Sequence, residues 1–253
     1  IHLLICLRDF EMAVTSALVF NFFSNKMNNF IFHDDGSLTD QLEKRLLSKL
    51  PGTRVIRRKT ADNLAKVTLK NYPNIRAFRE KQIMALKFID VKIWGEGNRI
   101  GYIDSDILFF KYPKEYLDSL KGNININLFN KDISDAYVTN IDNFIKGVDM
   151  TPYPAVNAGL WVMNKSDINL DQVERWLGNA FFKPFLNDYR LEQTLVSLLA
   201  NCSTNGASHF SQSYDVSFEK DLKSSVCKHY VGRIRYGYEL EGLHFLLNQL
   251  YVS

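Results

Sequence analysis

Residues 99–110 read Arg-Ile-Gly-Tyr-Ile-Asp-Ser-Asp-Ile-Leu-Phe-Phe, and this stretch decides the fold because two acids stand between two apolar runs. Each apolar run predicts a buried strand. In extended backbone, side chains at i and i+2 point to the same side, so Asp104 and Asp106 can converge on one polar partner. A carboxylate at the edge of a core costs several kcal/mol unless it is paired, hydrogen-bonded or bound to a cation. The pattern fits a divalent metal site, but acids also occur in simple turns between strands, and the pair alone does not decide between the two.

The composition indicates a folded protein that handles a small ligand. With 253 residues, 46% of them hydrophobic, the chain can bury a large core in a single α/β domain. The net charge of +3 comes from scattered Lys and Arg residues, which does not indicate a nucleic-acid binder and suits an anionic substrate.

The cysteines and the apolar segments bear on location. Cys6, Cys202 and Cys227 show no Cys-x-x-Cys spacing, so reduced thiols are expected rather than a disulfide scaffold or a zinc site. No apolar segment reaches the ~20 residues of an integral membrane helix. We expect a cytoplasmic protein, with peripheral association with a membrane left open.

Short apolar runs alternate with helical patterns along the first half of the chain, which predicts βαβ units and a mostly parallel sheet flanked by helices. Residues 130–154 are expected to form a loop region over a site. In such sheets, ligands bind at the carboxyl ends of the strands. Three acidic or polar clusters fall at these ends, at residues 8–9, 34–37 and 104–106. Besides the two runs around the acids, strands are expected at residues 2–7, 30–33, 54–57, 124–128 and 159–163, and helices at residues 11–24, 38–50, 73–94, 170–177 and 191–200.

Four pieces follow one another in order: Asp-Asp-Gly-Ser at 34–37, Tyr-Ile-Asp-Ser-Asp-Ile-Leu-Phe at 102–109, Asn-Ala-Gly-Leu-Trp-Val-Met-Asn at 157–164 and Lys-His-Tyr-Val-Gly at 228–232. Together they resemble nucleotide-sugar-dependent glycosyltransferases of the A-type (GT-A) fold, and the pattern is nearest to the glycogenin and lipopolysaccharide-sugar transferase group. The resemblance runs from Ile1 to about Tyr238. It implies one catalytic domain over residues 1–253, with a nucleotide-binding part at about 1–110 and an acceptor- and metal-completing part at about 111–253.

The resemblance also implies an activity and a metal. A sugar would pass from a nucleoside-diphosphate sugar, with UDP the expected nucleotide, to an acceptor glycan, lipid or protein that the motifs do not identify. Asp104 would contact the ribose or the metal, and Asp106 would bind the metal. His229 resembles the third ligand, and an imidazole beside oxygen ligands favours Mn²⁺ over Mg²⁺. The usual Lys-Pro-Trp after the glycine is absent, so Arg233 or Arg235 is expected to contact the diphosphate.

Further residues are expected around the donor. Asp34 and Asp35 resemble the site for base and ribose, where a carboxylate can accept the uracil imide N–H. Arg8, just past the first strand, is expected to line the same pocket, and Asn157 to hydrogen-bond the hydroxyl groups of the sugar. The simpler alternatives are an Asp-Gly turn and an ordinary entry into a strand.

Two carboxylates compete for the role of catalytic group. Glu192 lies where the resemblance implies an acid near the transferred sugar, as a general base or as a sugar ligand, and Asp188 is the competing choice. Three cations, Arg79, Lys81 and Lys87, lie on the helix expected before the acids. Any of them could face a diphosphate, and at least two are expected to be solvated.

Three other classes of protein remain open. Aspartyl-nucleophile phosphatases also place Asp-x-Asp after a strand, but there a small hydroxyl residue usually follows, whereas Ile107 and Leu108 follow here. A module that binds nucleotide sugars without turnover would keep the same acids. A nucleotidyltransferase would normally show a Gly-rich loop after the first strand, and residues 7–10 contain no glycine. The sequence therefore favours a metal-dependent glycosyltransferase.

Overall fold

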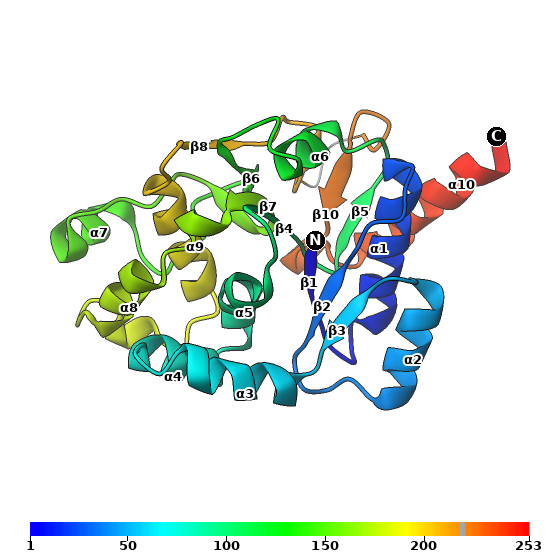
Figure 1. Cartoon of the computed structure of the whole chain (residues 1–253). Helices are drawn as coiled ribbons and strands as arrows, with labels where there is room; N and C mark the ends of the chain where they lie inside the picture. The colour runs from blue at the N-terminus through cyan, green and yellow to red at the C-terminus, as the bar shows by residue number, and fades with distance from the viewer. Residues whose placement is uncertain (218–220, 253) are drawn as a thin grey trace.

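Seven strands form the central sheet in the order β3-β2-β1-β4-β7-β6-β8 (Figure 1). The computed structural model describes residues 1–217 and 221–252. Strand β1 pairs in parallel with β2 and β4, and β2 with β3, whereas β7 runs antiparallel to both β4 and β6. The sheet is mostly parallel, as predicted, with one reversed strand inside it. The strands are β1 (His2–Ile5), β2 (Ile31–Asp34), β3 (Arg54–Ile56), β4 (Arg99–Ile103), β6 (Asn127–Lys131), β7 (Val156–Asn164) and β8 (Ala207–His209).

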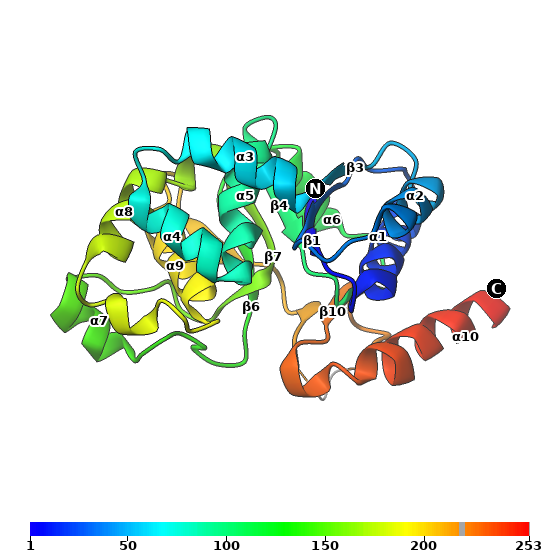
Figure 2. The same cartoon turned by 90° about the horizontal axis from the view of Figure 1, so that it is seen from below.

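Helices cover both faces of this sheet (Figures 1 and 2). Alternation along the strands creates two cores, because Tyr102 and Trp161 contribute to one apolar cluster and their neighbours Ile103 and Leu160 to the other. No helix among residues 1–217 and 221–252 is long and apolar enough to cross a membrane. The first cluster takes in side chains of α3 (Arg58–Thr68), α4 (Pro73–Lys81), α5 (Leu86–Trp94), α7 (Ile141–Val148), α8 (Leu170–Gly178) and α9 (Leu191–Asn201), and the second those of α1 (Phe10–Ser24), α2 (Asp40–Lys49) and α6 (Lys114–Leu120).

A second, three-stranded sheet contains β5 (Ile107–Phe109), β10 (Cys227–His229) and β9 (Tyr214–Asp215). Strand β10 runs antiparallel to β5, with His229 opposite Ile107, and parallel to β9. Beyond it, a π-helical turn at Tyr238–Leu243 leads into α10 (His244–Val252), which projects from the body of the protein in Figure 2. The Tyr238 hydroxyl donates to the carbonyl of Met12 at 3.0 Å, so this late segment is held against α1.

The prediction of one continuous helix over residues 73–94 is wrong. Gln82 has extended backbone (φ −116°, ψ 112°) and ends α4, and a 3-10 turn at Ile83–Ala85 precedes α5. The break lets Arg79 reach Asp90, eleven residues later, with 2.8 Å between Nη2 and Oδ2. In one continuous helix these residues would be about 16 Å apart along the axis. A buried ion pair thus accompanies the turn between the two helices.

Three smaller differences concern polar segments. The loop expected over residues 130–154 contains α7, which begins where the Asn140 side chain accepts the N–H of Asn143 at 3.0 Å. Helix α3 was not predicted at all. Strand β6 begins at Asn127 rather than at residue 124, because pairing with β8 starts there, where the Asn127 N–H donates to the carbonyl of Gly206 at 3.0 Å.

Candidate metal centre

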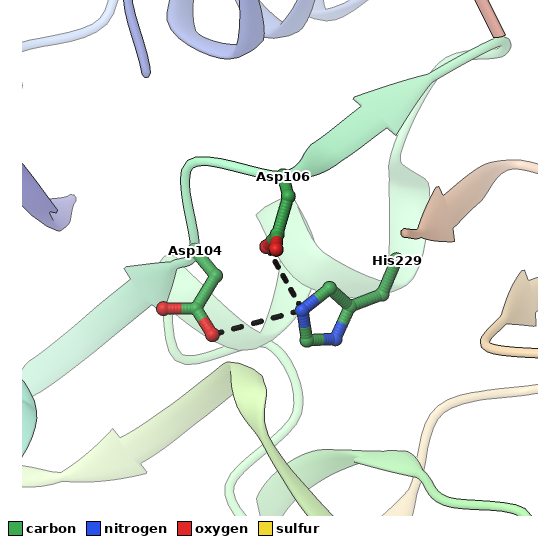
Figure 3. A group of neighbouring side chains, drawn as sticks. All are labelled: Asp104, Asp106 and His229. Carbon is green, nitrogen blue, oxygen red and sulfur yellow. Dashed lines mark hydrogen bonds and ion pairs between the residues drawn. The ribbon is translucent and has the colours of Figure 1, made fainter. Parts of the chain in front are cut away.

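Asp104 and Asp106 lie in the short turn that joins β4 to β5, and His229 ends β10 beside them (Figure 3). Hydrogen bonds to neighbouring segments fix this turn. The Asp104 N–H donates to the carbonyl of Gly159 in β7 at 2.7 Å, and the Tyr230 N–H donates to the carbonyl of Asp106 at 2.9 Å. The two acids and the imidazole therefore converge at the carboxyl end of β4.

The three side chains surround a common point. His229 Nε2 lies 3.0 Å from Asp106 Oδ1 and 3.7 Å from Asp104 Oδ2, and one ligand atom from each residue lies within 4.8 Å of the others. Asp106 and His229 are buried, whereas Asp104 is partly exposed and leaves one side accessible. The structure thus brings together the three residues that the sequence analysis named as metal ligands.

Asn157 sets the orientation of the His229 ring. Its Oδ1 lies 2.8 Å from Nδ1 of His229 and accepts the N–H of Gly159 at 3.1 Å, while its Nδ2 donates to Asp132 at 3.1 Å. Because the Asp132 carboxylate can only accept a hydrogen bond, it fixes which end of the Asn157 amide is the nitrogen. The Asn157 oxygen therefore faces His229, so Nδ1 of the imidazole carries the hydrogen and Nε2 faces the carboxylates. This is the arrangement of a metal-binding histidine with an outer hydrogen-bond partner.

Gly159 makes room for the cluster. A Cβ at this position would lie 2.2 Å from Cε1 of His229 and 2.8 Å from Oδ2 of Asp104. The backbone of β7 therefore approaches the ring and the carboxylate as closely as a main chain can, and only glycine fits there without a shift. The missing side chain thus makes room for two side chains of the protein.

Burial and charge act in opposite directions on the ligands. Burial favours the neutral form of Asp106, but the adjacent His229 outweighs it and lowers the pKa of this carboxyl. Burial likewise opposes a charged imidazole, yet Asp106 and then Asp104 raise the pKa of His229. The carboxylates and the imidazole therefore stabilise one another's charged forms.

Lys87 lies inside the site and is buried, although at least two of the three cations on the predicted helix were expected to be solvated. Its Nζ is 2.9 Å from Asp104 Oδ2 and 3.7 Å from Glu192 Oε2. Burial disfavours its charge, but Asp104 and Glu192 together raise its pKa, so the ammonium persists. Arg79 is also buried, in its ion pair with Asp90, so two of the three helix cations are not solvated.

Glu192 is the buried acid of the site, 3% exposed, and its Oε1 has no hydrogen-bond partner among the described residues. Burial raises the pKa of Glu192 to about 7, with Lys87 opposing this shift and Asp104 adding to it. Asp188 instead pairs with Arg190 in its own turn, with 2.7 Å between Oδ2 and Nη2. Of the two candidate carboxylates, only Glu192 adjoins the residues around Asp104.

A chain of charges links the end of β1 to the centre. Asp9 binds Arg8 (Oδ1 to Nε, 2.9 Å) and Arg235 (Oδ2 to Nη2, 2.6 Å), and Arg235 Nη1 is 3.9 Å from Asp106 Oδ2. Burial alone would raise the pKa of Asp9, but the two guanidinium groups lower it to about 2. Arg233 is exposed on the same turn, so Arg235 is the guanidinium that faces the acids.

Asp34 supports its own loop, which corrects the expectation of a free base-binding carboxylate. Its Oδ1 accepts the N–H groups of Gly36 at 2.8 Å and Leu38 at 3.0 Å, and its Oδ2 lies 3.2 Å from Arg57. Both oxygens are therefore engaged within the fold. Asp35, which is less buried, is the acid at this strand end that remains accessible.

The donor set fits a divalent cation. Two carboxylates and one imidazole supply oxygen and nitrogen ligands at the distances given above, and Gly159 keeps the space between them clear. With three protein ligands, a bound divalent ion would have room for further oxygen ligands.

Comparison with known proteins gives the fold. No protein-family model and no curated protein sequence matches the chain. Mouse xyloside xylosyltransferase 1 is similar over 92% of this chain and 96% of its own (12% identity, TM-score 0.56). Galactosyltransferase LgtC, in complex with donor and acceptor sugar analogues, is similar over 92% of this chain and 87% of its own, at 13% identity and a TM-score of 0.55. Core-mannan synthase A from Aspergillus fumigatus, in a Mn/GDP form, is similar over 83% of this chain and 71% of its own, at 9% identity and a TM-score of 0.51. The protein therefore has the GT-A glycosyltransferase fold, as the sequence motifs predicted.

Proposed function

We propose that this protein is a metal-dependent glycosyltransferase that moves a sugar from a nucleoside-diphosphate sugar, with UDP as the nucleotide, to an acceptor hydroxyl. The observation that carries the proposal is the convergence of Asp104, Asp106 and His229 at the end of β4 in a GT-A fold. The solved LgtC complex with donor and acceptor analogues and the Mn/GDP form of core-mannan synthase A support it by similarity of fold.

The charged side chains have distinct roles in this proposal. Asp104, Asp106 and His229 would hold Mn²⁺, and the bound ion would supply positive charge to offset the charge that develops on the departing diphosphate. Arg235 faces the phosphates from the turn after β10. Either Arg233 or Arg235 was expected to make this contact. Arg8 and Asp35 stand at the ends of β1 and β2, where the base and ribose would lie.

Lys87 and Glu192 are assigned to the sugar end of the donor. Lys87 holds Asp104 in place, and Glu192 stands behind it in a dry environment. In the transfer, the acceptor oxygen bonds to the anomeric carbon and the bond from that carbon to the phosphate oxygen breaks. The electron pair of that bond leaves on the diphosphate. The hydroxyl proton passes to this diphosphate or to Glu192, whose pKa of about 7 suits a group that exchanges protons near neutral pH.

The other classes rank lower. The GT-A fold does not support an aspartyl-nucleophile phosphatase, and a binding module without turnover differs from the proposed enzyme only in activity.

The three cysteines are unpaired, which favours the reducing environment of the cytoplasm.

The test compares Asp106→Asn with the matched control Asp142→Asn, which changes an exposed acid on α7. Calorimetry should show that the unmodified protein binds UDP only with Mn²⁺, and that Asp106→Asn weakens this binding at least about 100-fold, beyond the range of outer-shell changes. Release of UDP from UDP-glucose and UDP-galactose measures turnover, and GDP-mannose tests the nucleotide.

Each other result has a defined meaning. Undiminished binding and turnover in Asp106→Asn would exclude the metal role. Binding without release of nucleotide from any donor would indicate a binding module. A covalent phosphate on Asp104 would revive the phosphatase, and a preference for GDP would correct the nucleotide.

A further inference from the structure

Residues 232–243, which we call the strap, join β10 to α10 and pass beside the metal centre. The strap carries Arg235, whose Nη1 lies 3.9 Å from Asp106 Oδ2. It begins with a 3-10 turn at Gly232–Ile234 and ends with the π-helical turn at Tyr238–Leu243. π-helical turns are rare and are frequent at functional sites. The position of Arg235 therefore depends on how the two ends of the strap are held.

An ion pair fixes the far end of the strap to β10. Lys228 Nζ lies 3.1 Å from Oε1 and 3.0 Å from Oε2 of Glu241, so one ammonium group binds both carboxylate oxygens. The Lys228 side chain is 2% exposed, whereas that of Glu241 is 40% exposed. Lys228 directly precedes the metal ligand His229, and successive side chains of a strand point to opposite faces. The strap thus leaves β10 after His229 and is brought back to the other face of the same strand by Glu241.

Close packing determines where the π-helical turn lies. A Cβ at Gly242 would be 2.6 Å from Cδ1 of Leu108 and 2.7 Å from the hydroxyl oxygen of Tyr230. The backbone of the turn therefore lies directly against β5 and the residue that follows β10, where a larger residue would require a shift. The hydrogen bond from Tyr238 to the carbonyl of Met12 holds the start of the turn. These contacts specify one position for the far end of the strap.

A second acid stands beside Lys228. Asp215 is opposite Lys228 in the parallel pairing of β9 with β10, so the two side chains lie on the same face of the small sheet. Asp215 Oδ1 accepts the N–H of Ser217 at 2.9 Å, but its Oδ2 is buried and has no hydrogen-bond partner within the described part of the chain. A buried carboxylate oxygen without a donor costs free energy. Lys228 is a donor on the same face that can satisfy this oxygen if it leaves Glu241.

We propose that the ion pair between Lys228 and Glu241 positions Arg235 for donor binding, and that Asp215 is the acid to which Lys228 turns when the strap is released. The proposal rests on the proposed function, in which Arg235 faces the diphosphate. With the pair formed, the strap is held against β10 and Arg235 lies beside Asp106. With Lys228 turned to Asp215, the buried ammonium keeps an acidic partner, so release of the strap leaves no unpaired charge in the core. Lys228 and Glu241 are thus positioning residues.

The first experiment compares Glu241→Gln with the matched control Glu239→Gln, which changes an exposed acid on the same turn. Calorimetry measures the affinity for UDP with Mn²⁺, and an NMR titration measures the affinity for uridine, which has no phosphate. Glu241→Gln should weaken UDP binding by about 3- to 10-fold, a usual scale for coupling between residues of one network, and leave the affinity for uridine unchanged. Glu239→Gln should change neither affinity.

Two further variants assign this effect to Arg235. In the Arg235→Gln background, Glu241→Gln should weaken UDP binding no further, because the guanidinium that the ion pair positions is absent. Lys228→Met removes the same ion pair without leaving a buried ammonium unpaired. It should weaken UDP binding to the same extent as Glu241→Gln, which keeps the test decisive if one of the two variants does not fold.

Urea unfolding tests the exchange of partners without any nucleotide. Glu241→Gln alone should shift the urea midpoint little, because Lys228 can turn to Asp215. Asp215→Asn removes that alternative, so the double variant should lose more than the sum of the two single shifts. Additive shifts would mean that Asp215 is not the second partner of Lys228, and would overturn that part of the proposal.

Three results would overturn the positioning role. The first is unchanged UDP affinity in Glu241→Gln and Lys228→Met. The second is an equal loss of affinity for UDP and for uridine, which would indicate a merely structural role. The third is an undiminished effect of Glu241→Gln in the Arg235→Gln background. Failure of the unmodified protein to bind UDP with Mn²⁺ would instead count against the proposed function, and the urea measurements would still test the exchange of partners.

Discussion

Gly159 shows how much of the centre depends on one missing side chain. In Gly159→Ala, the new Cβ would overlap the His229 ring and the Asp104 carboxylate, so one of them must move. We expect Mn²⁺ affinity to fall by roughly 10- to 100-fold, the scale of changes in the shell around a metal site. Electron paramagnetic resonance of free Mn²⁺ measures this directly.

A glycine at the end of α8 provides the control for that substitution. In Gly178→Ala the Cβ would approach only the Asn74 amide, at 3.1 Å, so any local shift involves no residue of the centre. Mn²⁺ binding should be unchanged in this variant. Wild-type affinity in Gly159→Ala would mean that the three side chains are not the ligands.

At the residue scale, the two acids were predicted from their spacing, and His229 from the resemblance of residues 228–232 to a known family. Asp104 and Asp106 are two residues apart at the end of a strand, and His229 ends an apolar run. The expectation that at least two of the three helix cations are solvated was wrong, because it rested on the usual exposure of such side chains, whereas Arg79 and Lys87 are buried. The signal was present, since Lys87 interrupts the apolar sequence of residues 86–91, but its partners Asp104 and Glu192 come from other elements.

At the scale of elements, strands β1 and β2 share a pair of buried histidines that should make stability depend on pH. Nδ1 of His2 lies 2.8 Å from Nε2 of His33, so one ring donates and the other accepts. Burial lowers the pKa of both histidines, and that of His33 falls to about 3. These rings are neutral in the folded state throughout the mildly acidic range.

The sign of the effect follows from linkage. In the unfolded chain these histidines titrate near pH 6.5, so the unfolded state binds protons that the folded state does not. The free energy of unfolding should therefore decrease as the pH falls from about 6.5 towards 3, by a few kcal/mol in all. Urea unfolding at pH 7.5, 6 and 5 tests this, with the double variant His2→Phe/His33→Phe as the control. An equal pH slope in that variant would contradict the assignment.

The break between α4 and α5 was beyond prediction from local pattern. Apolar spacing is compatible with one helix through residues 73–94, and no proline or glycine interrupts it after Pro73 until Gly95. What requires the break is tertiary, because Arg79 pairs with both Asp90 and Asp62 inside the fold. A buried ion pair of this kind is recognised only when both partners are placed in space.

For the whole molecule, a ligand that binds only the folded state should raise the melting temperature. At 100 times its dissociation constant, UDP with Mn²⁺ would stabilise the fold by about 2.7 kcal/mol, or roughly 5–10 °C for a chain of this length. Differential scanning fluorimetry should show this shift with both components present. The same shift in Asp106→Asn would place the nucleotide elsewhere.

The overall architecture was predictable in its first half and less so in its second. Alternating strands and helices at residues 1–110 give right-handed parallel units with few alternatives. The reversed strand β7 and the small sheet of β5, β9 and β10 depend on pairings between distant segments. Strand β9 has two residues, too few for any periodicity to reveal it.

The sequence separation within the ligand set also bears on when the centre can form. Asp106 and His229 are 123 residues apart. At 5–20 residues per second, a ribosome would add the histidine roughly 6 to 25 seconds after the acids. Strand β10 must then close this long loop by pairing with β5. A nascent chain that has exposed only the Asp-x-Asp turn would therefore lack the third proposed ligand, and on the proposed function its competence to bind the donor would arise late in biosynthesis.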